Sequence, residues 1–337
     1  MPLWPVYTGT QEPHDGITRL PPPPPWRAFD GGPELDTPAD TADTAATSAD
    51  RTHRAQTYRA TPDTVQLVNA ALYLRRPLLV TGPPGTGKSS LAYAVARELR
   101  LGPVLRWNIT SRSTLHDGLY QYDPLSRLYA ARQAPSTPTP ESGVEDHLRL
   151  GPLGTALLPY ARPRALLIDE IDKSDLDLPN DLLNVLEEGQ YEIPELVRAA
   201  RHVPTARVMV DGTHDRVPVE RGRVRCRAFP FVVLTSNGER EFPPAFLRRC
   251  VTLRLRQPDD RQLADIVRAH FDDEPDAYAQ TLISRFLSRV GGGDLATDQL
   301  LNAIYLARSA DLPADSLDDL AAQLMPYLGE GRHTDGL

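Results

Sequence analysis

From Thr61 onward, apolar and polar residues alternate in blocks that predict strands and helices in turn. Short, continuously apolar runs predict buried strands, because a parallel sheet covered on both faces carries apolar residues at successive positions. Such runs lie at 77–80, 165–168 and 231–234, and two further strands, with polar residues among the apolar ones, are predicted at 104–109 and 251–255. Apolar residues at helical spacing predict helices at 65–72, 89–99 and 176–188, and Gly189 ends the last of these. The alternation predicts an α/β fold with a doubly wound parallel sheet.

Beyond Pro258 only helical spacing remains, around 263–270, 282–290 and 300–306. A run of helices after an α/β domain predicts a C-terminal helical lid. We therefore expect three parts: an N-terminal segment and linker over 1–60, an α/β domain over 61–257 and the lid over 258–330. Residues 135–146, rich in proline, serine and threonine, predict a surface loop.

The first 60 residues do not have the pattern of a packed domain. Pro21–Pro25 predicts a stiff polyproline II segment, and 30–50 contain six acids and no base, which predicts a disordered linker. Aromatic residues flank the proline run, at Trp4, Tyr7, Trp26 and Phe29. Aromatic side chains are scarce in solvated tails, so we favour a segment that docks on the body or on a neighbour over a loose tail.

Composition narrows the class of protein. The 337 residues have a formal charge of −8 that is spread along the chain, so no domain-wide basic field attracts nucleic acid. Cys226 and Cys250 lack the spacing of a zinc site, which favours a reduced compartment. No basic-then-apolar signal opens the sequence, and no apolar run approaches about 18 residues. We expect a cytoplasmic protein without a membrane span.

The run Gly-Pro-Pro-Gly-Thr-Gly-Lys-Ser at 82–89 matches the pattern G-x-x-x-x-G-K-[ST]. Glycines let backbone N–H groups converge on phosphate oxygens, and the following helix directs its positive end at them. Lys88 is predicted to reach the β- and γ-phosphates, and the Ser89 hydroxyl to ligate Mg²⁺. Of 37 Lys and Arg residues only 88 and 173 are lysine, which suggests that Lys88 has a role that a planar guanidinium cannot fill. The predicted nucleotide contacts are Gly82, Pro83, Pro84, Gly85, Thr86, Gly87, Lys88, Ser89 and Ser90.

Polar residues end three of the predicted strands. Asp169 and Glu170 follow a buried strand, where Asp169 is predicted to orient Mg²⁺ through its water shell and Glu170 to act as general base on the attacking water. Asn237 is predicted to bridge the γ-phosphate and that water, with ordinary turn chemistry as the alternative. Asn108 either holds Glu170 unproductive until a partner binds or is an ordinary strand-end residue.

Two arginines, Arg248 and Arg249, follow a predicted helical turn. They are either a solvated helix end or include a catalytic arginine finger, a charge supplied to the transferring phosphoryl group of a neighbouring subunit. The glycine loop, the Asp-Glu strand end, the Ser-Asn strand end and Leu-Arg-Arg-Cys, in this order and spacing, resemble an AAA+ ATPase module. That resemblance aligns Arg249 with the finger.

Three further stretches resemble the MoxR family of AAA+ ATPases, at 151–153, at 169–173 and from 208–212 through 229–237. The resemblance covers about 60–310. It implies an ATP hydrolase that uses ATP and Mg²⁺ and forms a homo-oligomeric, hexameric ring. It also implies chaperone-like remodelling or activation of a protein partner such as a von Willebrand A-domain protein. The basic sensor-2 residue usual in the family is missing from 291–299, and Arg308 is the nearest substitute.

Two other functions remain open. The first is a nucleic-acid-stimulated motor of a restriction or defence system, which the acidic balance disfavours. In its favour, arginines surround the predicted hairpin, and they could track phosphates, grip an acidic polypeptide or simply face solvent; they are Arg198, Arg201, Arg207, Arg216, Arg221, Arg223, Arg225 and Arg227. The second is a nucleotide-gated scaffold that hydrolyses slowly.

Overall fold

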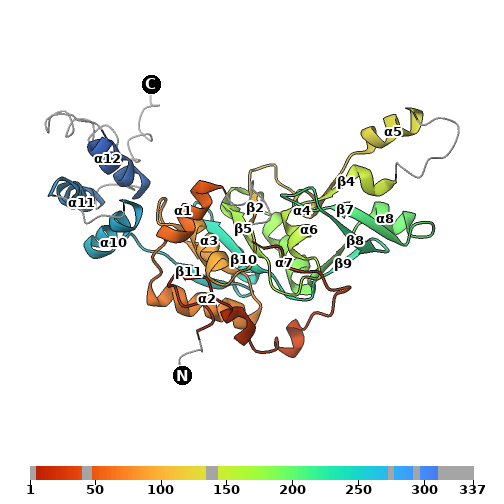
Figure 1. Ribbon diagram of the computed structural model, residues 1–337, viewed down its shortest axis with the longest axis horizontal. Coiled ribbons are helices and arrows are strands. Elements are labelled where there is room, and N and C mark those ends of the chain that lie inside the picture. The colour runs from red at the N-terminus through yellow and green to blue at the C-terminus, as the bar shows by residue number, and fades with distance from the viewer. Residues whose placement is uncertain (1–4, 40–47, 134–142, 272–276, 291–296, 310–337) are drawn as a thin grey trace.

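The computed structural model describes residues 5–39, 48–133, 143–271, 277–290 and 297–309. Its centre is a five-stranded parallel sheet in the order β11-β1-β10-β5-β2 (Figure 1). The strands are β1 (Leu78–Thr81), β2 (Leu105–Asn108), β5 (Ala165–Asp169), β10 (Phe231–Ser236) and β11 (Val251–Arg254). Each coincides with one of the predicted strands. Parallel strands put their carboxyl ends at one edge of a sheet, where ligands bind in open α/β folds.

Both faces of this sheet are buried, and successive residues of a strand enter different cores. Leu166 and Ile168 of β5 belong to the core that contains α6 (Pro152–Ala156) and α7 (Leu178–Glu188). Ala165 and Leu167 belong to the core formed with α2 (Pro62–Leu74) and α3 (Lys88–Glu98). This arrangement explains why the central strands β5 and β10 are apolar at successive positions, and it confirms the doubly wound sheet.

A second sheet of six strands, in the order β3-β4-β7-β8-β9-β6, packs into the first of these cores. Its strands are β3 (Tyr120–Tyr122), β4 (Leu148–Leu150), β6 (Gln190–Glu192), β7 (Thr205–Met209), β8 (Arg216–Glu220) and β9 (Arg223–Arg225). The short helix α4 (Leu115–Leu119) leads into β3, and α5 (Pro124–Gln133), η3 (Val144–His147) and α8 (Pro194–Ala199) lie between later strands of this sheet. The sequence predicted only its hairpin. The predicted loop at 135–146 falls largely outside the described residues.

The C-terminal helices form a lid with a core of their own, which includes Leu263, Leu282, Phe286 and Leu300. They are α10 (Asp260–Phe271), α11 (Ala277–Val290) and α12 (Thr297–Ser309). The lid lies at one end of the molecule in Figure 1, and the second sheet with α5 lies at the other. This confirms the predicted helical lid; its expected end at 310–330 lies outside the described residues. Among the described helices, none is both long enough and apolar enough to cross a bilayer.

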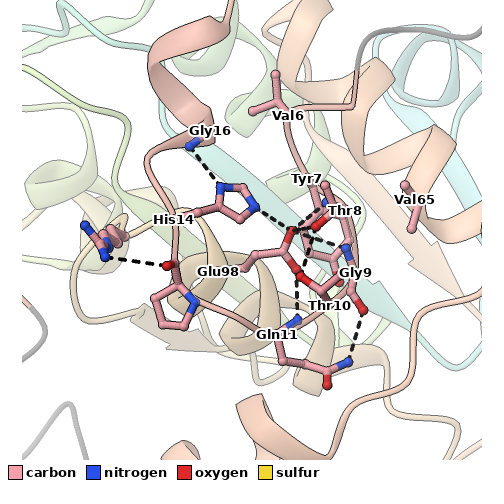
Figure 2. A network of polar contacts seen from close by, with 12 residues as sticks. Val6, Tyr7, Thr8, Gly9, Thr10, Gln11, His14, Gly16, Val65 and Glu98 are labelled. Atoms are coloured by element: carbon pink, nitrogen blue, oxygen red, sulfur yellow. Dashed lines mark hydrogen bonds and ion pairs between the residues drawn. The ribbon is translucent and has the colours of Figure 1, made fainter.

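The N-terminal segment packs on the α/β domain, as its aromatic residues predicted. The N–H groups of Val6 and Tyr7 donate to Oδ1 of Asn69 on α2, at 2.8 and 2.9 Å. Figure 2 shows the next contact, in which the fully buried Glu98 carboxylate of α3 accepts hydrogen bonds from several groups of residues 8–14. These donors are the N–H groups of Thr8, Gly9 and Gln11, the Thr8 hydroxyl and Nε2 of His14.

Farther along, Arg27 is buried and caps two helix ends. Its guanidinium donates to the carbonyls of Arg75, Leu186 and Glu187, which end α2 and α7, and lies over the Phe229 ring. The segment includes two short turns, η1 (Gly16–Arg19) and η2 (Pro25–Arg27). Burial lowers the pKa of Arg27, and the nearby charge of Glu187 opposes that shift. A cation also suits the negative end of a helix, which is where this buried arginine lies.

The disordered-linker interpretation of 30–50 is wrong for its described residues. Gly31 N–H donates to the Cys226 carbonyl, and Leu35 forms a β-bridge with Tyr160. A helix, α1 (Ala49–Thr57), then packs against α3 and α10, with the His53 ring 5.0 Å from that of His270. Because backbone pairing with the body satisfies this acidic segment's N–H groups, its composition alone was misleading.

Candidate functional site

The glycine loop connects β1 to α3 at the carboxyl edge of the main sheet. Gly85 and Gly87 have φ angles of 74° and 81°, in the left-handed region that favours glycine. At Gly82 a Cβ atom would lie 2.5 Å from the Leu255 carbonyl oxygen, so this position has no room for a side chain. The first N–H groups of α3 have no partner inside the helix and point toward the loop. The loop therefore has the shape and the donors to hold an anion.

Lys88 is buried at the start of α3. Its Nζ donates to the carbonyls of Gly82 and Pro83, at 2.8 and 2.7 Å. Burial lowers the pKa of Lys88, and the carboxylates of Asp172, Asp169 and Glu170 oppose that shift. A cation bound only by neutral carbonyls, with carboxylates nearby, is suited to accept stronger anionic partners.

Asp169, the last residue of β5, gathers three donors. Its Oδ1 accepts from Ser89 Oγ at 2.6 Å and from Thr235 Oγ1 at 2.7 Å, and its Oδ2 accepts from Arg106 Nη2 at 2.8 Å. Burial alone would raise the pKa of Asp169, but these hydrogen bonds and the Arg106 charge outweigh it and lower the pKa. The carboxylate is thus kept ionised and oriented.

The Ser89 and Asp169 pair suits Mg²⁺. Ser89 Oγ and Asp169 Oδ1 are hard oxygen ligands, and they lie 2.6 Å apart beside the glycine loop. Within the described residues no group of three or more His, Cys, Asp or Glu is arranged to hold a metal ion. Magnesium is commonly bound by one or two protein oxygens, with substrate phosphates and water completing its shell. The residues present therefore fit Mg²⁺ delivered with a phosphate ligand.

Glu170 adopts left-handed backbone angles, φ 62° and ψ 48°, directly after β5. Its N–H donates to Thr235 Oγ1 at 2.9 Å, and its Oε2 pairs with Lys173 Nζ at 2.8 Å. Such angles are costly for a residue with a Cβ and mark a site where surrounding contacts impose them. Asn108 ends β2 opposite Asp169 in register, yet in the described part of the chain no hydrogen bond joins its side chain to Glu170.

Asn237 follows the last residue of β10, at the same edge. Its N–H donates to Oδ2 of Asp172 at 2.8 Å, and the N–H of Glu239 donates to the same oxygen at 3.2 Å. Asp172 is buried on η4 (Ile171–Lys173), so it ties the turn after β10 to the turn after β5. This contact keeps Asn237 beside the carboxylates.

Arg249 lies elsewhere. It follows α9 (Pro244–Leu247), and its guanidinium pairs with Glu187 of α7 and donates to the Ala245 carbonyl. Its side chain is about 42% exposed, so it is open to another molecule. The structure therefore brings together Lys88, Ser89, Asp169, Glu170 and Asn237, and leaves Arg249 apart. Arg308, the suggested sensor-2 substitute, lies over the Phe271 ring inside the lid.

Sequence reasoning missed three residues of this site: Arg106, Asp172 and Thr235. A usable signal existed for Arg106, because it is a charged residue inside an otherwise apolar predicted strand. Asp172 and Thr235 lie inside stretches that resemble the MoxR family, but nothing marked them individually, since a threonine in a strand and an acid after one are both ordinary.

The model of the AAA domain of the dynein-related subfamily matches residues 77–250, which hold the whole site. The chain belongs to this family. The AAA domain begins just before β1, ends just before β11 and includes the second sheet. It is a P-loop nucleotide-binding module of the ATPase class.

Among solved structures, the AAA domain protein resembles NtrX from Brucella abortus, determined in complex with ADP. The sequence identity is 16%, the TM-score is 0.37, and the match covers 82% of this chain and 58% of NtrX. This chain thus spans less than two thirds of that protein. A search of curated proteins found no match.

Proposed function

We propose that this chain is an ATP hydrolase of the MoxR type that works as a homo-oligomeric ring and remodels or activates a protein partner. One observation carries the proposal: Asp169 is hydrogen-bonded to Ser89 of the glycine loop while the adjacent Glu170 stands at the same sheet edge. That arrangement has an anion cradle, a metal-binding pair and a base together, which are the parts that phosphoryl transfer needs.

Residues 82–90 would hold the triphosphate. Backbone N–H groups at the start of α3 donate to phosphate oxygens, and Lys88 exchanges the carbonyls of Gly82 and Pro83 for the β- and γ-phosphates. Ser89 and Asp169 would hold Mg²⁺, which when bound neutralises phosphate charge and polarises the γ-phosphate. Binding is then favoured by charge compensation that a glycine turn alone does not offer.

Glu170 would accept the proton of the attacking water. The water oxygen bonds to the γ-phosphorus, the bond from that phosphorus to the bridging oxygen breaks, and ADP leaves with the bond's electron pair. Asn237 would orient that water with its uncharged amide. Glu170 pairs with Lys173, so it must leave this partner before it can reach the water.

A ring is the assembly that gives Arg249 a catalytic role. Its contacts are with α7 and α9 and not with its own glycine loop, and its side chain is accessible. A guanidinium supplied by a neighbouring subunit would stabilise the charge that develops on the transferring phosphoryl group.

The hairpin arginines favour a protein partner over nucleic acid. Five of the eight pair with acids of the same chain: Arg198 with Glu195, Arg216 with Asp146, Arg223 with Glu192, Arg225 with Asp30 and Arg227 with Glu34. Paired arginines release fewer counterions on binding a phosphate backbone, which weakens affinity for nucleic acid. The suggestion of a von Willebrand A-domain partner rests on the MoxR resemblance alone.

Glu170→Gln and Lys88→Ala test the proposal together. Glu170→Gln should bind ATP like the natural chain but turn it over at least about 10²-fold more slowly, because a general base is lost. Lys88→Ala should lose ATP binding. Glu188→Gln, the same charge change at an exposed position of α7, should behave like the natural chain. ATP binding that survives Lys88→Ala would contradict the site, and unchanged turnover in Glu170→Gln would remove its base.

A second experiment separates the partner classes. The trapped Glu170→Gln protein should retain a polypeptide in pull-downs at physiological salt. ATPase activity stimulated by DNA or RNA, steeply salt-dependent and lost when Arg221, Arg223 and Arg225 are replaced by serine, would establish the motor alternative instead. If the natural chain hydrolyses ATP more slowly than it exchanges its partner, the nucleotide-gated scaffold would be established instead.

A further inference from the structure

Arg106 of β2 is a charged residue bonded directly to the carboxylate expected beside Mg²⁺. Its Nη2 lies 2.8 Å from Oδ2 of Asp169, whose side chain is about 9% exposed. Its Nε is buried and makes no hydrogen bond. The Arg106 side chain is about 33% exposed, and the carboxylate of Asp169 is the acceptor that draws its guanidinium into the site.

A buried carboxylate needs compensating charge. Lys88 acts on Asp169 through its charge, and two further cations can contact the carboxylate directly. One is Arg106, which is present in the fold. The other is the divalent cation that would arrive with a nucleotide. Two cations on one carboxylate repel each other strongly where water is scarce. The full Arg106 contact and a bound Mg²⁺ therefore oppose each other.

We propose that Arg106 is the resident counter-ion of Asp169, a positioning residue that competes with Mg²⁺ and so sets the Mg²⁺ concentration at which nucleotide binds. The inference rests on the proposed function, because it concerns the metal of the same site. Without nucleotide, Arg106 stabilises the ionised carboxylate. When Mg²⁺ enters with ATP, the guanidinium withdraws from Oδ2.

The fold leaves room for that withdrawal. Arg106 also lines a cavity of about 350 Å³, together with Asp36, Asp211 and Asp215. Burial raises the pKa of Asp211, against the opposing charges of Arg149 and Arg164, so its carboxyl would be stabilised by another cation. The cavity therefore gives a guanidinium that leaves Asp169 space and three carboxylate acceptors, beside the two arginines that also line it, Arg51 and Arg164.

The direction of the effect follows from what remains when Arg106 loses its charge. Ser89 and Thr235 still bond Oδ1 of Asp169, so the carboxylate keeps its orientation. The term that changes is the repulsion between the guanidinium and the dication. A neutral residue at 106 should therefore strengthen Mg²⁺ binding.

The test follows binding of mant-AMPPNP, a fluorescent ATP analogue that resists hydrolysis, while free Mg²⁺ is raised from micromolar to millimolar. Arg106→Gln keeps an N–H donor but no charge, and it should reach half-saturation at about tenfold lower free Mg²⁺, because the repulsion between the guanidinium and the dication is removed. Arg106→Lys keeps the charge and should match the natural chain. In EDTA, Arg106→Gln should not bind the analogue more tightly, because a lost positive charge cannot favour a triphosphate. Circular dichroism and melting temperature confirm that each variant folds.

An unchanged Mg²⁺ midpoint in folded Arg106→Gln would overturn the inference while leaving the proposed function intact. A higher midpoint would also overturn it, since Arg106 would then orient Asp169 and not compete for it. If the natural chain does not bind the analogue at any Mg²⁺ concentration, the proposed function fails, and the inference fails with it.

Discussion

The Thr235 hydroxyl donates to Oδ1 of Asp169 at 2.7 Å. Thr235 Oγ1 also accepts the N–H of Glu170 at 2.9 Å, so one side chain of β10 contacts both acids at the end of the neighbouring strand. Thr235 is buried, and β10 is the direct neighbour of β5 in the sheet. Its two bonds lock the strained turn at Glu170 to the orientation of Asp169.

Thr235→Val should therefore reduce ATP turnover about 10–100-fold, the usual cost of removing a partner that orients a metal-binding group. Valine has nearly the same shape but neither donates to Asp169 nor accepts from Glu170. Steady-state phosphate release measures the effect. Thr235→Ser keeps the hydroxyl and should recover most of the activity. If valine and serine gave the same rate, the hydroxyl would have no orienting role.

Glu98→Gln should loosen the N-terminal segment. Every group that faces the buried Glu98 carboxylate donates a hydrogen bond to it. A glutamine amide has one oxygen that accepts and one NH₂ group that donates, so its NH₂ group would face some of these donors and leave them without an acceptor. We expect a loss of roughly 2–3 kcal/mol in the free energy of unfolding, measured in urea. Hydrogen exchange at residues 6–14 should rise as well.

The matched control for Glu98 is Asp15→Asn on the same segment. Asp15 pairs with Arg100 and Arg162, and all three side chains are well exposed, so this change should cost less than about 1 kcal/mol. Equal losses in the two variants would mean that the Glu98 network does not fasten the segment.

Arg249→Ala should keep nucleotide binding and lose most turnover if the guanidinium acts on a neighbouring subunit. Mixed with inactive Lys88→Ala subunits, it should regain activity, because an intact arginine can then face an intact glycine loop. A trans-acting arginine is worth about 10³–10⁵ in rate. No recovery in rings that contain both subunits would indicate a role within one chain.

Glu187→Gln distinguishes the two roles of Arg249 independently. It breaks the ion pair with Arg249 but leaves the arginine present. If Arg249 serves a neighbour, this variant should keep its turnover. A loss as large as that of Arg249→Ala would mean that the pair itself, as a contact between α7 and the segment after α9, is what matters.

The contact between α1 and the lid should weaken in acid. Burial lowers the pKa of His270 below its ordinary 6.5, with His53 and Arg59 adding to the effect. The unfolded chain therefore takes up a proton near pH 6.5 while the folded chain resists it, so stability falls as pH drops below about 6.5. Melting temperatures between pH 7.5 and 5.5 should fall less steeply in His270→Asn, which keeps a donor for the Ile266 carbonyl. Identical slopes would contradict this.

Local pattern was sufficient for the main sheet, its helices and the glycine loop. Runs such as 165–168 and 231–234 are apolar at every position because both faces of the sheet are covered there, and that condition is visible in a short window of sequence. The loop at 82–89 was equally visible, since glycine spacing and one lysine define it. The strand ends at Asp169 and Asn237 followed from the same strands.

Contacts between distant segments were decided only by the tertiary structure. Glu98 and residues 8–14, Arg27 and the ends of α2 and α7, and Arg249 with Glu187 are each separated by tens of residues or more. A polar residue's partner depends on which chain segments the fold brings within about 3 Å, and no periodicity encodes that. The acidic composition of 30–50 predicted disorder because composition does not show which distant residues the segment contacts. In the fold, the carbonyls of Cys226 and Pro159 accept backbone N–H groups of this segment. Its packing against the α/β domain outweighs the conformational entropy that is lost when the segment is ordered.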